Sequence, residues 1–155
     1  MFHKVKTVHV CGPLKIVVWF EGGESRLYDC EPIVRKAPRF LALEYDSDLF
    51  ERVHVVGGGY GIEWNDELDL ACDELYHNGI PLDIVEAERM RIVADVVKVR
   101  KAHNMSQSYL EKASGVSQPV IARLERGETA PQLDTLLKIL APLGKTLQVI
   151  DYCSS

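Results

Sequence analysis

The chain has 155 residues and a net charge of −5, with 46% hydrophobic and 26% charged residues. These proportions are typical of a soluble globular protein, and the length permits one ordinary domain or two small ones. The longest apolar run, residues 16–20, is far shorter than the roughly 20 residues that span a membrane. The N-terminus lacks the apolar segment of a secretory signal. We therefore expect a cytoplasmic protein that has no membrane partner.

The four cysteines predict neither a disulfide framework nor a metal site. They stand at Cys11, Cys30, Cys72 and Cys153, and no two form a CxxC pair. In a chain of this size, such spacing is typical of reduced thiols in a cytosolic protein. We expect no bound metal or cofactor.

The charge is distributed unevenly along the chain. Residues 1–85 contain 8 basic and 15 acidic side chains, whereas residues 86–155 contain 10 basic and 8 acidic ones. Within residues 98–127 there are 6 basic and 2 acidic side chains. A basic segment on an acidic body can still bind nucleic acid through local phosphate contacts. The shift predicts two domains, at residues 1–82 and 83–155.

The first half alternates apolar and polar residues and is punctuated by glycine and proline. This pattern predicts strands with two hairpins, the first turning at Gly22-Gly23 and the second at the glycine cluster 57–61. A short helix over residues 70–77, ended by Asn78-Gly79, follows. The expected strands cover residues 5–10, 15–20, 26–28, 53–56 and 62–64.

Three features of the first half invite functional interpretations that the spacing does not favour. The glycine cluster fits neither phosphate-binding spacing, and strands are expected on both of its sides. The acidic run 63–74 has the side chains of a metal or acid/base cluster, but it lacks EF-hand spacing and is typical of a solvated face. Four histidines, at positions 3, 9, 54 and 77, show no ligand-spaced motif. No catalytic residue is therefore assigned.

Several segments of the first half resemble the small DUF2442 domains. The resemblance implies a small α+β module of unassigned activity, a type often encoded beside small partner proteins or fused to DNA-binding domains. It does not imply any chemistry. The residues that carry the resemblance are 14–20, 21–23, 49–50, 61–64 and 68–70.

From about Ile92 the apolar period becomes that of helices. A first helix is expected from near Ile84 to His103-Asn104, where asparagine readily adopts a left-handed cap. Ser106 is a suitable N-cap for a second helix, which Gly115 ends after Ser114. A glycine-containing turn this short is what a helix-turn-helix needs.

Two more helices and a strand are expected after that turn. Ser117 precedes a third helix over residues 118–126, with its side chain bonding to the amide of Val120 and Gly127 closing the helix. Residues 146–150 predict a terminal strand. The fourth helix is expected to place its apolar stripe at Leu133, Leu136, Leu137 and Leu140.

This half resembles the Cro/CI-type (XRE) helix-turn-helix family over residues 93–151. The resemblance implies an all-α, lambda-repressor-like domain, and with the first half the fold class is α+β. Residues 143–149 resemble the tail of antitoxin-type members, whereas Gln132 and Pro142 depart from the family's pattern around the fourth helix. The matching residues are Arg100, Ser106, Gln107, Leu110, Ala113, Gly115, Val116, Ser117, Ile121, Leu124, Glu125, Arg126, Gly127, Pro131, Leu133, Leu136 and Leu137.

In this architecture the third helix lies in the major groove. Helical geometry places residues 118, 119, 122 and 123 on one face, away from Ile121 and Leu124. Glutamine suits the edge of adenine and arginine that of guanine, whereas proline and alanine suit the thymine methyl. The expected base contacts are therefore Gln118, Pro119, Ala122 and Arg123. The resemblance implies phosphate contacts by Gln107, Ser117 and Arg126 and a structural ion pair between Arg100 and Glu125.

Each contact has a structural alternative, in that Arg123 or Arg126 can pair with a surface carboxylate. The main hypothesis is a sequence-specific regulator that binds double-stranded DNA as a homodimer. The alternative is an antitoxin-like protein that binds a small protein partner and autoregulates its operon. A helix-turn-helix retained as a protein-binding scaffold is a third interpretation. An enzyme is not expected, because no nucleophile–base or metal constellation is present.

Overall fold

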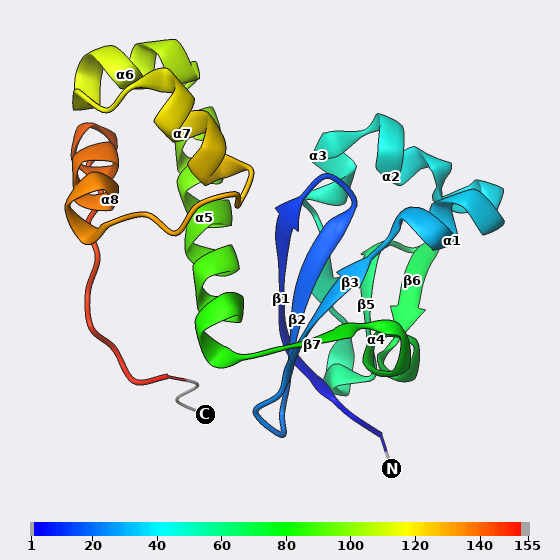
Figure 1. The fold of residues 1–155 in the computed structure, drawn as a ribbon. Coiled ribbons are helices and arrows are strands. Elements are labelled where there is room, and N and C mark those ends of the chain that lie inside the picture. The colour runs from blue at the N-terminus through cyan, green and yellow to red at the C-terminus, as the bar shows by residue number, and fades with distance from the viewer. Residues whose placement is uncertain (1, 153–155) are drawn as a thin grey trace. The chain divides into compact units, whose positions relative to one another are not determined.

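A computed structural model describes residues 2–152 and has an α+β fold (Figure 1). Its contacts divide the chain into two compact units, residues 1–91 and 92–155. The division falls inside α5 (Ile84–Ala102), nine residues after the boundary that the charge pattern predicts. The domain limits of 1–82 and 83–155 therefore stay a prediction.

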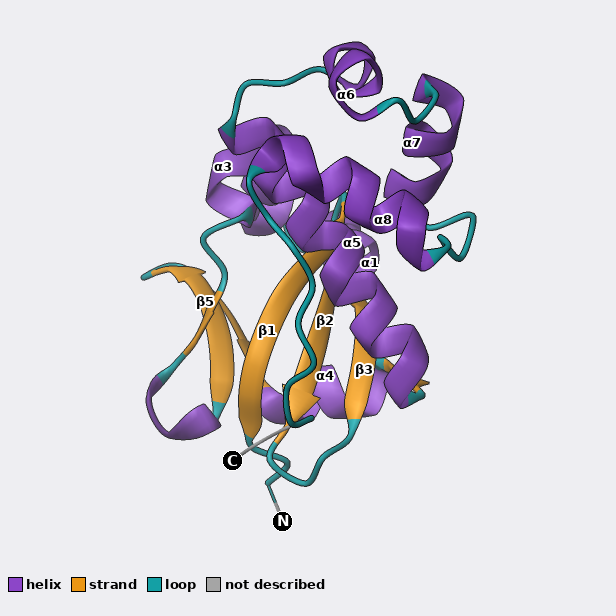
Figure 2. Cartoon of the chain, turned by 90° about the vertical axis from the view of Figure 1, so that its left-hand side faces the viewer, coloured by secondary structure: helices purple, strands orange, loops and turns teal. Residues whose placement is uncertain are grey.

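The first unit contains a four-stranded antiparallel sheet in the order β1-β2-β3-β7. Its strands are β1 (Val5–Gly12), β2 (Lys15–Phe20), β3 (Ser25–Asp29) and β7 (Ile80–Leu82). Figure 2 shows β1, β2 and β3 side by side. The three predicted strands and the glycine hairpin between β2 and β3 are confirmed. β7 was not predicted, because it contains Pro81, which a sheet tolerates only at an edge such as this one.

A second sheet of the same unit has the order β4-β5-β6. It consists of β4 (His54–Val55), β5 (Gly61–Asn65) and β6 (Leu68–Ala71), all antiparallel. The predicted hairpin around the glycine cluster is confirmed. The predicted start of the helix at residue 70 is wrong, because Leu70 pairs with Ile62 in the sheet and α4 (Cys72–Asn78) begins only after β6.

Short helices connect the two sheets. They are α1 (Glu31–Lys36), η1 (Pro38–Leu41), α2 (Ala42–Tyr45) and α3 (Ser47–Phe50). Phe40, Phe50 and Trp64 meet in an apolar core together with the inward residues of both sheets. The core of this unit is therefore built almost wholly from aliphatic and aromatic side chains.

The glycine cluster has a structural explanation. A 3₁₀ turn, η2 (Gly57–Gly59), joins β4 to β5. Gly59 has φ +79°, and a Cβ there would lie 2.6 Å from the carbonyl oxygen of Val5. A side chain at this position would be strained and would also clash with the backbone. Close packing on β1 thus accounts for Gly59 without a bound phosphate.

The second unit contains the four expected helices. They are the C-terminal half of α5, α6 (Gln107–Ser114), α7 (Gln118–Glu125) and α8 (Leu133–Leu140), followed by η3 (Ala141–Leu143). Three of the local signals that delimit them are confirmed. Asn104 has φ +54° after α5, the Ser106 hydroxyl accepts a hydrogen bond from the Tyr109 amide at 3.0 Å, and Gly115 ends α6 with φ +77°.

The buried face of α8 differs from the predicted stripe. Leu136 and Leu140 are buried as expected, but the third buried residue is Ile139. Leu133 is 63% exposed and Leu137 is 36% exposed, so their prediction as core residues is wrong. The spacing of the four leucines does place them on one stripe of the helix, but the packed face is rotated toward Ile139, so Leu133 and Leu137 lie outside it. The neighbouring helices decide which of the apolar residues become buried.

The predicted terminal strand is also wrong. Residues 145–150 belong to no helix or strand in the described part of the chain. Figure 1 shows this segment as a red trace that leaves α8 without coiling. A strand requires a second strand to bond with, and no pairing of this segment occurs among residues 2–152.

Candidate nucleic-acid interface

The site is built on the turn between α6 and α7. Gly115 supplies a left-handed residue at the end of α6, and three residues later α7 begins with Pro119 in its first turn. Proline fits there because the first amides of a helix have no intrahelical acceptor. The side-chain cap predicted for Ser117 is wrong, since the Val120 amide bonds instead to the Ser117 carbonyl at 3.0 Å. The exposed Ser117 hydroxyl is thus not used by the helix.

The outer face of α7 is narrower than its sequence indicates. Pro119 and Arg123 are exposed and Gln118 is half-buried, as the helical spacing predicts. Ala122, however, is only 8% exposed. Its placement on the outer face is wrong, because its small methyl group lies with Ile121 and Leu124 on the buried side of the helix. Little of Ala122 is therefore accessible to DNA.

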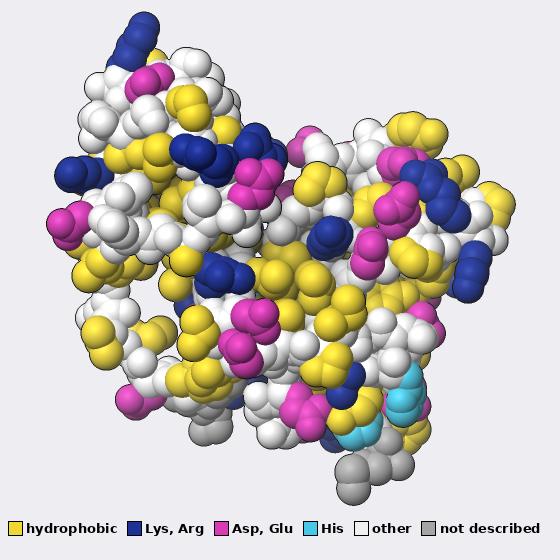
Figure 3. All heavy atoms as spheres, viewed as in Figure 1, with side chains coloured by type: hydrophobic (Ala, Val, Ile, Leu, Met, Phe, Trp, Pro, Cys, Tyr) yellow, Lys and Arg dark blue, Asp and Glu magenta, His cyan; other side chains and the backbone are white. Residues whose placement is uncertain are grey.

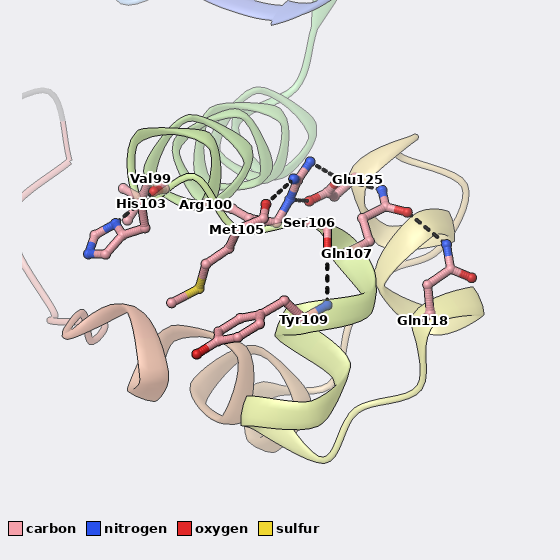
Figure 4. Close-up of polar contacts among 9 residues, drawn as sticks. All are labelled: Val99, Arg100, His103, Met105, Ser106, Gln107, Tyr109, Gln118 and Glu125. Carbon is pink, nitrogen blue, oxygen red and sulfur yellow. Dashed lines mark hydrogen bonds and ion pairs between the residues drawn. The ribbon is translucent and has the colours of Figure 1, made fainter.

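A buried ion pair lies behind this face (Figure 4). The Arg100 Nε atom donates to Glu125 Oε1 at 2.6 Å, and its NH2 group donates to Glu125 Oε2 at 2.9 Å. The remaining terminal nitrogen donates to the carbonyl oxygen of Met105 at 2.8 Å. Only 11% of the Arg100 side chain and 7% of the Glu125 side chain are exposed. One guanidinium thus joins the end of α5, the following loop and the end of α7.

Two glutamines extend this ion pair to the surface. Gln107 Nε2 donates to Glu125 Oε2 at 2.7 Å, and Gln118 Nε2 donates to Gln107 Oε1 at 2.8 Å. Gln107 and Gln118 are the first residues of α6 and α7. Figure 4 shows the two amides in line between Glu125 and the start of α7.

The carboxylate fixes the orientation of both amides. An ionised carboxylate accepts hydrogen bonds and cannot donate them, so the Nε2 atom of Gln107 must face Glu125. Its Oε1 atom then faces Gln118, which has to present Nε2 in turn. Gln118 keeps its Oε1 acceptor and one N–H donor, the pair of groups that recognises adenine. Gln107 keeps one N–H donor, which suits a phosphate oxygen.

Arg126 is engaged by a carboxylate at the surface. Its Nε and NH2 atoms donate to Glu128 at 2.8 and 3.2 Å, and both side chains are more than half exposed. These hydrogen bonds raise the pKa of Arg126 and lower that of Glu128. Both shifts favour the charged forms. A phosphate would therefore have to compete with Glu128 for Arg126. Glu128 lies only two residues after Arg126 in the sequence, so it is a carboxylate partner of the kind that the sequence left open.

Exposed basic residues lie on or next to α7 and on the neighbouring helices α5 and α6. Besides Arg123 and Arg126, the exposed basic residues of this stretch are Lys98, Lys101 and Lys112. In Figure 3, lysine and arginine side chains gather over α7. The arrangement provides positive charge beside two polar groups with fixed directions, which can bind an anionic polymer and contact bases along it.

The described residues hold no group of three or more His, Cys, Asp or Glu side chains arranged for a metal ion. Within residues 2–152, no helix is both long and apolar enough to cross a bilayer.

Comparison with known families assigns both units. Residues 96–150 match the family model described as Helix-turn-helix, which covers α6, α7 and the network behind them. The C-terminal unit carries a Cro/CI-type helix-turn-helix domain. Residues 5–81 match the family described as DUF2442, a protein of unknown function. Both resemblances drawn from the sequence are confirmed.

One relative is similar in sequence to part of this chain. An uncharacterized HTH-type transcriptional regulator of Haemophilus influenzae is 52% identical over 62 residues, which make up 40% of this chain. The match spans 63% of that regulator's length.

Two solved structures are similar to parts of the chain. One is a toxin-antitoxin module from Streptococcus pneumoniae, 54% identical, with a TM-score of 0.40 over 44% of this chain and 76% of that one. The other is described as a candidate DNA-binding protein from Nitrosomonas europaea, 20% identical, with a TM-score of 0.43 over 88% of this chain and 84% of that one.

Proposed function

We propose that the protein is a sequence-specific, DNA-binding transcriptional regulator that places α7 in the major groove. It acts in the cytoplasm as a homodimer and is a binding protein rather than an enzyme. The observation that carries the proposal is the polar chain from Glu125 through Gln107 to Gln118. It holds a half-buried amide at the start of the second helix of a helix-turn-helix, where such domains contact base edges.

The contacts follow from side-chain chemistry. Gln118 reads adenine with its remaining acceptor and donor, and Arg123 reads guanine with its exposed fork of donors. Pro119 contacts a thymine methyl. Gln107, Ser117 and Arg126 bind phosphates and set the register of the helix on the duplex without reading sequence.

The first unit has a different role in this proposal. Residues 1–85 carry 15 acidic and 8 basic side chains, so DNA would repel this region. We assign to it the binding of a partner or effector, separate from the DNA contact.

The test begins with selection of bound fragments from a random DNA pool by the full-length protein, followed by fluorescence anisotropy on the selected site. We expect binding that weakens steeply as salt rises, because bound phosphates release counterions. Arg123→Ala and Gln118→Ala should each weaken binding by about 5- to 150-fold, the loss of one bidentate base contact of about 1–3 kcal/mol. Each variant should also relax the sequence preference at one base pair.

Lys138→Ala is the matched control for charge, because Lys138 is an exposed lysine on α8. It should leave the sequence preference unchanged. Absence of salt-dependent binding, or an affinity unaffected by the double variant Gln118→Ala with Arg123→Ala, would contradict the proposal. Tight co-purification with a small protein encoded next to the gene, without a selected DNA site, would instead favour the antitoxin-like alternative.

A further inference from the structure

Both ring nitrogens of His54 face hydrogen-bond acceptors. Nδ1 lies 2.9 Å from the carbonyl oxygen of Arg52, and Nε2 lies 3.0 Å from Glu63 Oε1. A neutral imidazole carries one N–H group and can donate to only one of these oxygens, whereas an imidazolium carries two and can donate to both. The hydrogen bonding around His54 is therefore complete only when the ring is protonated.

The two acceptors belong to different elements of the first unit. Arg52 lies in the turn after α3, and Glu63 lies on β5 directly opposite His54. β4 consists of His54 and Val55 alone, which is shorter than an ordinary strand and leaves it few backbone bonds to its neighbour. Protonated His54 thus joins this short strand both to the preceding turn and to β5.

The charges near His54 also favour the imidazolium. Asp69 of β6 lies directly opposite Glu63, and like charges that face each other across strands are destabilising. A positive ring beside Glu63 offsets this repulsion. The other charged or titratable groups on the elements next to His54 are Glu51 and Arg52 in the preceding turn and Lys6 and His9 on β1, which packs against β4.

The pKa of His54 is raised, chiefly by the hydrogen bond to the Arg52 carbonyl and then by Glu63. The His54 side chain is 55% exposed, so water can deliver and remove the proton. Because the pKa is higher in the folded protein than in the unfolded chain, the protonated ring stabilises the fold. This stabilisation is complete below the ordinary histidine pKa of about 6.5 and is lost as the pH rises through the raised value.

β4 leads into a turn that holds the start of the chain. Gly59 of η2 approaches the backbone of Val5 so closely that a Cβ there would lie 2.6 Å from the Val5 carbonyl oxygen. The next residue, Tyr60, meets Phe2 edge-on with 5.5 Å between ring centroids, and Lys4 Nζ lies 5.0 Å from the centre of its ring. The attachment of β4 therefore bears on how residues 2–5 are held.

We propose that His54 is a proton switch in the first unit. The protonated ring clamps β4 between the turn at Arg52 and β5. Loss of the proton at higher pH breaks one of the two hydrogen bonds and lets residues 53–60 open more often. The switch makes the surface around η2 sensitive to pH. It goes beyond the DNA contact proposed above and concerns residues 1–91 alone, so its tests use no DNA.

The first experiment follows the Cε1–H signals of the five histidines by NMR in the full-length protein, from about pH 5 to about pH 9. His54→Gln identifies the His54 signal by its absence. The wild-type midpoint should lie above about 6.5, and Glu63→Gln should lower it by removing the charge of the acceptor. Glu67→Gln is the matched control, because Glu67 is exposed at the turn of the same hairpin, and it should leave the midpoint in place.

The second experiment measures hydrogen exchange of the Val56 amide, which bonds to the Gly61 carbonyl at 3.0 Å next to β4. Its protection factor should fall by about two- to fivefold between about pH 6 and about pH 8, the weight of one exposed charged hydrogen bond. The fall should be absent in His54→Gln. The Phe20 amide, which bonds to the Glu24 carbonyl at 2.8 Å beside the other sheet, is the internal control and should keep its protection in both proteins.

A His54 midpoint at or below about 6.5 would overturn the inference, as would a midpoint that Glu63→Gln leaves unchanged. A fall in Val56 protection that persists in His54→Gln would assign the pH response to another group and contradict the switch. A raised midpoint with constant Val56 protection would show that His54 does not control β4, which also contradicts it. Neither readout involves DNA, so failure of the proposed DNA binding would leave this inference intact, and the reverse holds as well.

Discussion

The two units differ in what they bury. The described core of the first unit comprises 17 apolar residues from two sheets and their connecting helices. That of the second comprises 10, and beside it lies Arg100, which is 9% exposed. Ser25 is the other buried polar residue among those described. The first unit is thus held by apolar packing, whereas the second combines a small core with a buried charge that is linked to its surface.

This difference has an energetic consequence. A buried ion pair adds little net stability compared with apolar packing, but loss of one partner leaves an uncompensated charge in a low-dielectric site. The helix-turn-helix unit therefore depends on one carboxylate more than the first unit depends on any single polar group. The same carboxylate orients the residues that face DNA.

The largest expected effect comes from removal of that carboxylate. Glu125→Ala should lower the free energy of unfolding of the helical unit by about 3–5 kcal/mol, because it leaves Arg100 buried and unpaired. Circular dichroism at 222 nm under urea measures this loss. Both tryptophans, Trp19 and Trp64, lie in the first unit and are nearly buried. Their fluorescence transition should stay where it is in the wild type.

Glu128→Gln is the matched control for this variant. It breaks the exposed ion pair with Arg126 and should cost less than about 1 kcal/mol. Equal losses for Glu125→Ala and Glu128→Gln would show that the buried pair has no special role in the second unit. A matching shift in the tryptophan transition would show that the two units unfold together.

The next effect concerns the apolar core of the second unit. Ile139→Ala should destabilise the helical unit by about 2–5 kcal/mol, because Ile139 is fully buried and its truncation leaves a cavity. Leu133→Ala on the same helix should change stability by about 0.5 kcal/mol or less, because Leu133 is 63% exposed. Urea unfolding at 222 nm measures both. The reverse ranking would mean that the face of α8 predicted from the sequence, rather than the face observed in the structure, packs on the core.

These outcomes bear on what sequence can predict. Helix ends were predictable at Ser106, Gly115 and Asn104, because capping depends on a few adjacent residues. The buried face of α8 was not, because Leu133 and Ile139 are equally apolar and only the packing of neighbouring helices distinguishes them. β6 was merged with α4, because Leu68–Ala71 becomes a strand only through its pairing with β5.

In the candidate site too, some features could be predicted from the sequence, whereas others depend on tertiary packing. The outward positions of Gln118 and Arg123 follow from helical spacing, and the pairing of Arg100 with Glu125 was implied by family resemblance. The burial of Ala122 depends on how closely α7 approaches its neighbours, which a spacing of 100° per residue does not define. The bond from Gln118 to Gln107 joins residues 11 apart and requires the angle between α6 and α7 to be known.

A smaller effect tests whether the polar chain acts as a unit. If Gln107 orients Gln118, Gln107→Ala should relax the preference for adenine at the base pair that Gln118 contacts, with about a 5- to 20-fold loss of affinity. The double variant with Gln118→Ala should lose little more than Gln118→Ala alone, because the two residues share one interaction. Anisotropy titrations against DNA with each base at that position provide the cycle. Fully additive losses would contradict the coupling.

The smallest effect concerns Arg126. Glu128→Gln should tighten DNA binding by a few-fold, because it removes a carboxylate that competes with phosphate for the guanidinium. Arg126→Ala should weaken binding to all sequences alike and reduce the salt slope by about 1. If the gain from Glu128→Gln persists in the Arg126→Ala background, competition for Arg126 is not its cause.

In the hydrogen bonds that lead out from Glu125, each amide N–H donates toward the carboxylate. This fixed direction limits how mutation can change the base that Gln118 recognises. Glutamate at position 118 would suit the amino group of cytosine, yet its oxygen would then confront the Gln107 oxygen. Rotation of the Gln107 amide by half a turn would merely move the clash to Glu125. A new specificity of this kind would thus require a coordinated change at positions 107 and 118, and lineages that alter only the outer residue would pass through a form that binds poorly.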